Sequence, residues 1–347
     1  MPAGDEGNTM LTFPLLIGDI GGTTSRFALL SGQGAPPSRL SVMATARHAT
    51  PSDAIRAALA ALRGEAPRAA FLGVAGRVDG PVVRLTNAPW VVNAAQIGMD
   101  LGLSAVSLVN DYVPVAALLP SLDRESTGAL VHVGPALRLV QGNRIALGPG
   151  TGLGAAACIP VQERFWLQPT EAGHMAFGAC DSEELATWPR IERAGARIAV
   201  ETVLSGPGLV RLYRAVARRE GREPLHLLTP AEVIAAASSE RDEIASEALG
   251  LFFSLLGRFA GDMALAFNAS GGVYLASGIL PRIVGLLDKS RFRQAFERKD
   301  PFESAMARIP TFVVTQPEPA MAGLALIAGA PDRFVFQTYG WSAAGAS

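Results

Sequence analysis

Two glycine-rich segments, each set between apolar runs, constrain the fold of this chain more than any other feature. The first covers residues 18–24 (GDIGGTT) and the second covers residues 148–154 (GPGTGLG). Each pattern predicts a strand, a glycine-containing turn and a second strand, with a connection of five to six residues in the first hairpin. Strand and helix patterns follow each hairpin in turn, so two α/β domains with a cleft between them are expected.

Composition narrows the class of protein. The 347 residues include 49% hydrophobic ones, which is ample for packed cores, and the net charge of −1 comes without a basic cluster, so no nucleic-acid partner is expected. Residues 1–10 carry two acids and no base, unlike a signal peptide, and no uninterrupted apolar run approaches a membrane span. We therefore expect no membrane association and a cytoplasmic location. Cys158 and Cys180 lack metal-ligand spacing, which argues against a disulfide framework or a zinc site.

Helix signals are clearest at three places. Asn93 and Gln96 have the spacing of a capping box that opens a helix ending at Gly102. Ser205 is the expected N-cap of a second helix. Residues 240–269 carry a long helical repeat of apolar positions.

The two glycine loops have the composition of phosphate-binding turns. Adjacent glycines allow successive backbone N–H groups to point the same way and hold an anion. Asp19 in the first loop could bind a metal ion, directly or through water. Ordinary glycine hairpins are the alternative, but one such loop in each domain suits a nucleotide gripped across a cleft.

Asn110 and Asp111 end an apolar strand pattern. A strand-end carboxylate can accept a proton from a substrate hydroxyl, which is the role of a general base in phosphoryl transfer. The alternative for Asp111 is an N-cap of the helix that follows, a position that aspartate favours.

Several further polar residues stand out in a largely apolar chain. Glu171 and His174, in the segment EAGH, and Glu201 suit a loop that hydrogen-bonds several hydroxyls, although a structural histidine and a solvated glutamate are the alternatives. Gly278 could let an adenine ring approach the backbone, or it could simply be a turn. Asn87 could be an Asx-turn residue.

Together these motifs give the chain a family resemblance over about Leu16 to Leu326. It resembles the bacterial glucokinases of the hexokinase–actin-like ATPase superfamily, without the zinc-binding signature of the ROK branch. The segments that carry the resemblance are GDIGGT at 18–23, LTN at 85–87, NDY at 110–112, GPGTGLG at 148–154, EAGH at 171–174, ETVLSGPGL at 201–209 and GVYLASGILPR at 272–282.

The resemblance implies an α/β, two-domain actin-like ATPase (ribonuclease H-like) fold with a central interdomain cleft. Residues 1–121 and about 316–347 would form a small domain, and residues from about 122 to 315 a large one. The implied activity is that of a glycolytic glucokinase, with transfer of a phosphoryl group from ATP, with Mg²⁺, to D-glucose. A homodimer is common in the family.

The resemblance also implies a role for individual residues. Asp111 would be the catalytic base, and the sugar hydroxyls would bind Asn87, Asn110, Asp111, Glu171, His174 and Glu201. ATP would bind Gly18, Asp19, Ile20, Gly21, Gly22, Thr23, Gly150, Thr151, Gly152 and Gly278, with Asp19 near Mg²⁺ through water. The chain departs from the family at Thr24, Tyr112, Ala172 and Ser277, where Asn, Phe, Gly and Gly are usual, and no catalytic group is lost.

Other functions fit parts of the same pattern. A kinase of another hexose or of an amino sugar would use the same residues. A non-catalytic sugar sensor of the repressor type would need a DNA-binding basic helix, and none is apparent. A nucleotide-switched structural protein would have no need of the polar residues 171–174 and 201.

Overall fold

The computed structural model describes residues 11–60, 62, 64–122, 128–138, 140–224, 226, 229–239 and 241–343. The acidic segment 1–10, on which the expected lack of a signal peptide rested, lies outside these residues. The chain forms two compact units. Unit 1 comprises residues 1–122, 156–169 and 316–347, and unit 2 comprises residues 123–155 and 170–315. The division falls within two strands, β10 (Leu153–Val161) and β11 (Arg164–Thr170).

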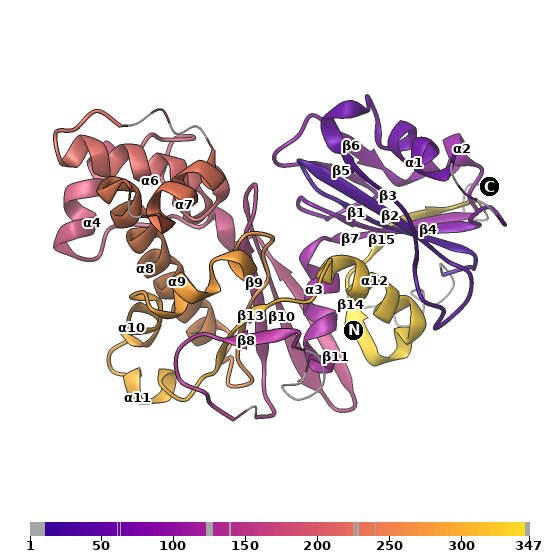
Figure 1. Cartoon of the computed structure of the whole chain (residues 1–347). Coiled ribbons are helices and arrows are strands. Elements are labelled where there is room, and N and C mark those ends of the chain that lie inside the picture. Colours follow the sequence, from indigo (N-terminus) through magenta and orange to yellow (C-terminus); the bar gives the residue numbers. More distant parts are fainter. Residues whose placement is uncertain are drawn as a thin grey trace. The chain divides into compact units, whose positions relative to one another are not determined.

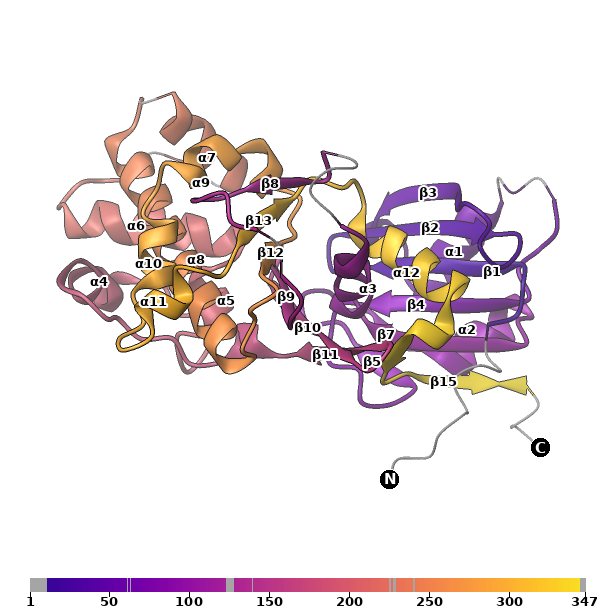
Figure 2. The same ribbon diagram turned by 90° about the horizontal axis from the view of Figure 1, so that it is seen from below.

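Unit 1 is built on a six-stranded sheet of order β15-β7-β4-β1-β2-β3 (Figure 2). Its strands are β1 (Leu15–Ile20), β2 (Thr24–Leu30), β3 (Ser38–Ala44), β4 (Ala69–Val74), β7 (Ala105–Asn110) and β15 (Tyr339–Ser342). The central strands β1, β4 and β7 run parallel to one another, whereas β2, β3 and β15 pair antiparallel with their neighbours.

Helices cover both faces of this sheet (Figure 1). On one face lie α1 (Pro51–Leu59) and α2 (Ala94–Leu101), which enclose an apolar core with the sheet. On the other lie α3 (Tyr112–Leu118) and α12 (Pro319–Gly329), which pack closely on each other. The short strands β5 (Val82–Arg84) and β6 (Val91–Asn93) pair with each other, and β14 (Phe334–Phe336) pairs with β11.

Unit 2 combines strands β9, β12, β13 and β8, hydrogen-bonded in that order, with a set of helices (Figure 1). The strands are β8 (Leu130–His132), β9 (Arg144–Pro149), β12 (Val273–Leu275) and β13 (Thr311–Val314). The helices are α4 (Ser182–Thr187), α5 (Val200–Val203), α6 (Gly206–Arg219), α7 (Pro230–Ser238), α8 (Glu243–Ala266), α9 (Val284–Asp288), α10 (Phe292–Glu297) and α11 (Glu303–Met306).

Helix α8 is the central helix of this unit, packed against α6, α7 and α10. Among the described residues it alone is long and apolar enough to cross a membrane by length and composition, but 72% of its most apolar window is buried inside the protein. A core helix has this character, because its apolar residues face neighbouring helices on most sides.

Three sequence predictions can be compared with the helices. The long helix over 240–269 is confirmed as α8, and the Oγ of Ser205 accepts from the amide of Gly208 at 3.0 Å, as an N-cap does. Of the two hydrogen bonds that the predicted capping box requires, one is confirmed and the other is wrong. Asn93 accepts from the amide of Gln96, but the Gln96 side chain donates to Asp100 at 2.6 Å instead of returning to the cap.

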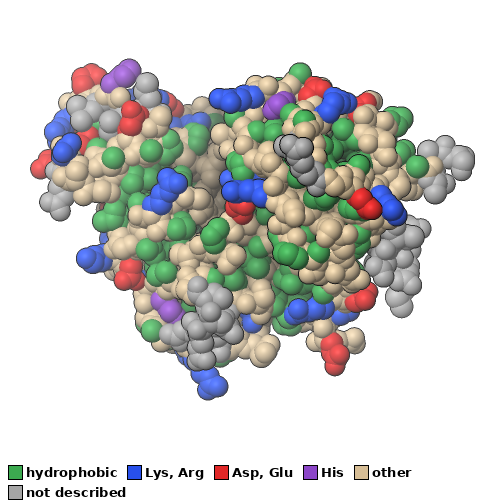
Figure 3. Space-filling view, turned by 45° about the vertical axis from the view of Figure 1, so that its right-hand side comes forward, with side chains coloured by type: hydrophobic (Ala, Val, Ile, Leu, Met, Phe, Trp, Pro, Cys, Tyr) green, Lys and Arg blue, Asp and Glu red, His purple; other side chains and the backbone are tan. Residues whose placement is uncertain are grey.

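The surface of the protein mixes charges of both signs. On the face drawn in Figure 3, basic and acidic side chains are interspersed among apolar and neutral ones, in keeping with the net charge of −1. Neither cysteine forms a disulfide, and Cys158 is buried whereas Cys180 is exposed.

Candidate active site

The carboxyl ends of three parallel strands meet at one edge of the unit 1 sheet. Ile20, Val74 and Asn110 are in register at the ends of β1, β4 and β7. The first glycine loop therefore follows β1, and Asp111 follows β7, at the same edge. In parallel α/β sheets this edge is where ligands bind, because the loops that follow the strands converge there.

The first loop is shorter than predicted. Asp19 and Ile20 belong to β1 and Thr24 belongs to β2, which leaves Gly21, Gly22 and Thr23 as the connection. The expected connection of five to six residues was wrong because Asp19 pairs across the hairpin with Arg26, which extends the ladder into a segment with turn-like residues.

The glycines of this loop are required by close approach rather than by backbone conformation, since neither has a positive φ. A Cβ on Gly21 would lie 2.8 Å from the carbonyl oxygen of Thr24, and one on Gly22 would lie 3.1 Å from Asn87. The hydroxyl of Thr45 donates to the carbonyl oxygen of Gly21 at 2.8 Å. These contacts fix the loop and place Asn87, in the turn between β5 and β6, beside it.

Two other residues that the sequence assigned to this loop lie deeper. Gly18 is inside β1, where a Cβ would approach the side chains of Leu72 and Phe27 to within 3 Å. The side chain of Ile20 is fully buried in the core between the sheet and helices α1 and α2. Both residues shape the strand that leads to the loop.

Asp19 is paired across the hairpin with Arg26, whose Nη1 lies 3.1 Å from Oδ2. Burial raises the pKa of the Asp19 carboxyl, and the Arg26 guanidinium opposes that shift. The side chain keeps 17% of its surface exposed, so an oxygen ligand remains accessible at the end of β1. Sequence reasoning missed Arg26, although its cross-strand position follows from the hairpin register.

Asn110 and Asp111, at the end of β7, differ in the contacts of their side chains. The Asn110 Oδ1 accepts from the amide of Tyr112 at 3.0 Å and its Nδ2 donates to the carbonyl of Gly76 at 3.2 Å, so this side chain ties two loops together. Asp111 precedes α3, but its carboxylate makes no capping hydrogen bond. The capping alternative is therefore excluded for Asp111.

The carboxylates of Asp111 and Asp19 both act on the phenol of Tyr112. Burial raises the pKa of Tyr112, and the two negative charges raise it further, so the phenol stays neutral. This shared neighbour shows that the two acids, from β1 and from the end of β7, belong to one electrostatic environment.

In unit 2 the second glycine loop is held from both sides. It connects β9 to β10 through residues 150–152, and the amide of Gly150 donates to the carbonyl of Gly152 at 2.8 Å. At the start of α6, the Gly206 amide donates to the Gly150 carbonyl at 2.8 Å. At the end of β12, the Ser277 hydroxyl donates to the Pro149 carbonyl at 2.7 Å. Thr151 lies within this anchored turn.

Gly150 and Gly278 differ from the glycines of the first loop. A Cβ at either position would meet no heavy atom of the chain within 4 Å. Nothing in the fold itself thus requires glycine there. An apolar pocket lies next to both, lined by residues that include Pro149, Gly206 and Ile279.

Three of the six residues predicted to bind sugar hydroxyls, Glu171, His174 and Glu201, lie together in unit 2. The Nδ1 of His174 is 3.6 Å from Oε1 of Glu201, and its Nε2 is 3.8 Å from Oε2 of Glu171. Glu201, in α5, also accepts from the amide of Leu153 at 3.4 Å, at the start of β10. Side-chain exposures of 42%, 41% and 21% for Glu171, His174 and Glu201 leave all three accessible to a ligand.

A glycine sets the position of this cluster. A Cβ on Gly173 would lie only 2.4 Å from the carbonyl oxygen of Leu153. The turn that carries Glu171 and His174 therefore packs directly against the strand that follows the second glycine loop.

Comparison with known proteins agrees with these features. The family model named Glucokinase matches residues 16–330. A glucokinase of Mesorhizobium japonicum is 40% identical over 345 residues, covering 99% of this chain and all of the relative, and one of a Chelativorans species is 41% identical over 96% of both chains. The crystal structure of a glucokinase from an Antarctic psychrotroph superposes with a TM-score of 0.75 at 29% identity, covering 91% of this chain and 99% of that one.

The fold and these similarities define a sugar kinase of the actin-like ATPase type, that is, a hexose phosphotransferase. The chain belongs to the glucokinase family.

Proposed function

We propose that this protein transfers the γ-phosphoryl group of ATP to the 6-hydroxyl of D-glucose, with Asp111 as the general base. The observation that carries the proposal is the position of Asp111, which lies at the same strand edge as the first glycine loop and is not used as a helix cap. Family membership and the curated glucokinase relatives support the substrate.

At phosphorus the reaction forms one bond and breaks one, and one proton is transferred. The 6-hydroxyl oxygen of glucose attacks the γ-phosphorus, the bond from that phosphorus to the β,γ-bridging oxygen breaks, and the hydroxyl proton passes to Asp111. ADP and glucose 6-phosphate are the products. Because phosphoryl transfer needs positioning and charge stabilisation more than covalent chemistry, the role of the remaining residues is to hold the reactants.

Each unit contributes a defined set of groups. In unit 1, Asn87 and Asn110 would bind sugar hydroxyls beside Asp111, and the loop 18–23 would bind phosphate. In unit 2, the cluster Glu171, His174 and Glu201 offers acceptors and a donor for several hydroxyls. A sugar that lacks one of these hydroxyls would leave a polar group of the protein, covered by the bound sugar, without its partner. Residues 150–152 would meet the phosphates, and Gly278, whose lack of a side chain the fold does not require, would face adenosine.

A magnesium ion fits the oxygen ligands of unit 1. Among the described residues no group of three or more His, Cys, Asp or Glu could hold a metal by itself. This suits Mg²⁺, which commonly binds one or two carboxylates, water and substrate phosphates rather than a cage of protein ligands. Asp19, partly exposed at the end of β1, would hold the ion through water. When bound, the ion would supply positive charge that offsets the charge developing on the phosphates.

The direct test is sugar-dependent ADP release from Mg²⁺-ATP with a panel of hexoses and amino sugars, and with a control lacking sugar. The Asp111→Asn variant should keep glucose binding and lose about 10²–10⁴-fold in kcat, the usual range for a general base. Glucose turnover by this variant at the wild-type rate would refute the role of Asp111. Best activity on another sugar would change the substrate and keep the mechanism, whereas ATP binding without sugar-dependent turnover would favour a sensor.

We also propose that the protein acts in the cytoplasm as a glycolytic enzyme, in line with its bacterial glucokinase relatives. The homodimer expected from the family is tested by light scattering of the purified protein, in which a mass of 36.2 kDa would indicate a monomer.

A further inference from the structure

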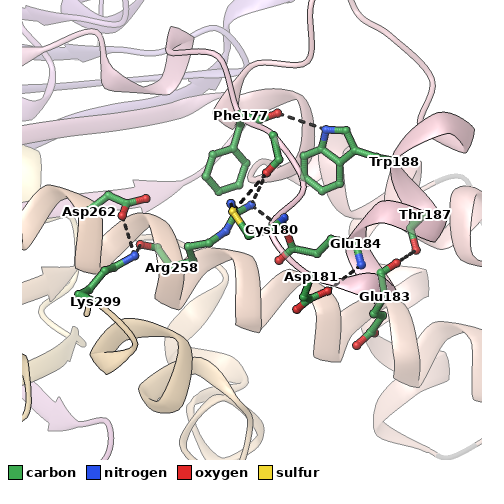
Figure 4. A network of polar contacts seen from close by, with 11 residues as sticks. Phe177, Cys180, Asp181, Glu183, Glu184, Thr187, Trp188, Arg258, Asp262 and Lys299 are labelled. Atoms are coloured by element: carbon green, nitrogen blue, oxygen red, sulfur yellow. Dashed lines mark hydrogen bonds and ion pairs between the residues drawn. The ribbon is translucent and has the colours of Figure 1, made fainter. Parts of the chain in front are cut away.

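Arg258, which lies outside the proposed site, contacts residues 177–180, in the segment that follows His174 (Figure 4). Arg258 comes from the middle of α8, and its Nη2 donates to the carbonyl oxygen of Gly178 at 2.9 Å. Its Nη1 lies 2.6 Å from the Sγ of Cys180, and its guanidinium carbon lies 4.0 Å from the centre of the Phe177 ring. The Arg258 side chain is only 15% exposed, although the two residues that its guanidinium nitrogens contact, Gly178 and Cys180, lie at the surface.

Phe177 is held on its other sides as well. Its amide donates to the carbonyl of Ile198 at 2.9 Å, and the Trp188 Nε1 donates to its carbonyl oxygen at 3.2 Å. The backbone N–H and C=O of Phe177 and its ring all make contacts, and the residue is 8% exposed. Phe177 is therefore held by several contacts, within a segment whose other residues lie nearer the surface.

Phe177 belongs to a short antiparallel ladder. Besides the Phe177–Ile198 bond, the amide of Val200 donates to the carbonyl of Met175 at 3.0 Å, and Ala176 pairs with Ala199. The ladder thus joins residues 175–177 to residues 198–200.

Two polar residues of the proposed sugar site lie at one end of this ladder. His174 immediately precedes its first strand, and Glu201 immediately follows its second. The separation of 3.6 Å between these two side chains therefore depends on the register of the ladder. A slip or loosening at Phe177 would move His174 relative to Glu201, since these backbone pairs join the two segments, together with the hydrogen bond from the Arg197 side chain to the His174 carbonyl at 2.9 Å.

We propose that Arg258 is a positioning residue for sugar binding, which through Phe177 and Gly178 holds the ladder that aligns His174 with Glu201. This inference rests on the proposed function, since it assigns the arginine to the sugar and not to ATP. Arg258 does not touch the sugar-binding side chains and acts through the backbone of residues 175–178.

A second contact of Arg258 supplies the competing explanation. Its Nη2 lies 3.3 Å from Oε2 of Glu184, whose side chain is 4% exposed. The arginine could be present only to balance that buried carboxylate, because leaving one buried charge unpaired is costly. The two explanations differ in what happens when Glu184, rather than Arg258, is changed.

The experiment compares four variants with wild type. Arg258→Met removes the grip on residues 177 and 178, Arg258→Lys keeps the charge, and Glu184→Gln breaks the ion pair while leaving the contacts to the ladder. Arg293→Met is the matched control. Arg293 is also a largely buried arginine of unit 2, its guanidinium carbon lies 4.8 Å from the centre of a phenylalanine ring, and it donates to backbone carbonyls. Those carbonyls belong to residues 306, 307 and 309 and not to residues 174–201.

Steady-state kinetics with glucose and with ATP, and calorimetric titration with D-glucose alone, are the measurements. Arg258→Met should raise KM for glucose and weaken glucose binding by about tenfold to a hundredfold, as expected for a displacement near 1 Å, with KM for ATP changed by less than about twofold. Arg258→Lys should recover part of this loss. Glu184→Gln and Arg293→Met should bind glucose like wild type, whatever their melting temperatures.

If Arg258→Met is too unstable to purify, the double variant Arg258→Met/Glu184→Gln, which leaves no unpaired buried carboxylate, replaces it. Unchanged glucose binding in Arg258→Met or in the double variant would overturn the inference while leaving the proposed function intact. Equal losses in Glu184→Gln would also overturn it in favour of charge balance. A wild-type protein that binds no glucose would refute the proposed function and this inference with it.

Discussion

Replacing Gly323 by alanine should displace the first turn of α3, and with it Asp111. Gly323 lies in α12, where a Cβ would be 1.8 Å from the carbonyl oxygen of Pro114 and 2.4 Å from its carbonyl carbon. Real Cβ atoms essentially never approach a heavy atom closer than 3.0 Å, so the two helices must separate by about 1.2 Å at this point. Pro114 is three residues after Asp111, so the displacement reaches the proposed base.

The magnitude follows from two general observations. Forcing extra volume into a well-packed contact costs about 1–3 kcal/mol. For a chain of 347 residues that corresponds to a fall of about 1–4 °C in melting temperature. A shift of about 1 Å in a catalytic group can cost about 10²-fold in rate, so kcat should fall by about tenfold to a hundredfold.

The assay pairs differential scanning fluorimetry with an ADP-coupled glucose assay. Gly329→Ala is the matched control, because it makes the same change in the same helix where a Cβ would lie at an ordinary 3.6 Å from Gly34. The control should keep wild-type activity and stability or gain slightly, since alanine favours helices over glycine. A Gly323→Ala variant with wild-type melting temperature and kcat would refute the reasoning that α12 positions Asp111 through α3.

Three further predictions concern single contacts. Burial raises the pKa of Glu184, so its contribution to stability is present below the ordinary glutamate pKa and is lost as pH rises through the raised folded value. The melting temperature of wild type relative to Glu184→Gln should therefore fall as the pH rises above the ordinary glutamate pKa of 4.5, and a constant difference would contradict this. Gly173→Ala should raise KM for glucose several-fold, because its Cβ would lie 2.4 Å from the Leu153 carbonyl; an unchanged KM would argue against the packing. Thr45→Val removes the hydroxyl that holds Gly21, so KM for ATP should rise with a loss of about 1 kcal/mol in stability, and a loss of stability alone would separate Thr45 from ATP binding.

Much of the local structure could be predicted from the sequence. The apolar runs around the two glycine segments specified strands, and Ser205 specified where α6 begins. The repeat of apolar positions over 240–269 specified α8. These features depend on neighbours within a few residues, and the physical preferences of the residues for strands, turns and caps act at that range.

The tertiary structure decided which of several local partners a polar side chain takes. Asp111 could have capped α3 and Gln96 could have closed a capping box, but neither does. Aspartate is typical of turns, but Asp19 lies in a strand because Arg26 pairs with it across the hairpin. Each choice depends on which other group is within reach, and short sequence windows do not contain that group.

The sequence by itself also determined the family and the identity of the candidate residues, through motifs that each occupy a few positions. Only the tertiary structure brought Glu201 within 4 Å of His174 and placed Arg258 against the segment that follows His174. Glu171 and His174 share one turn, but Glu201 and Arg258 are separated from that turn along the chain by more than any turn spans. Sheet register and helix packing, which are settled by the whole chain at once, set those distances.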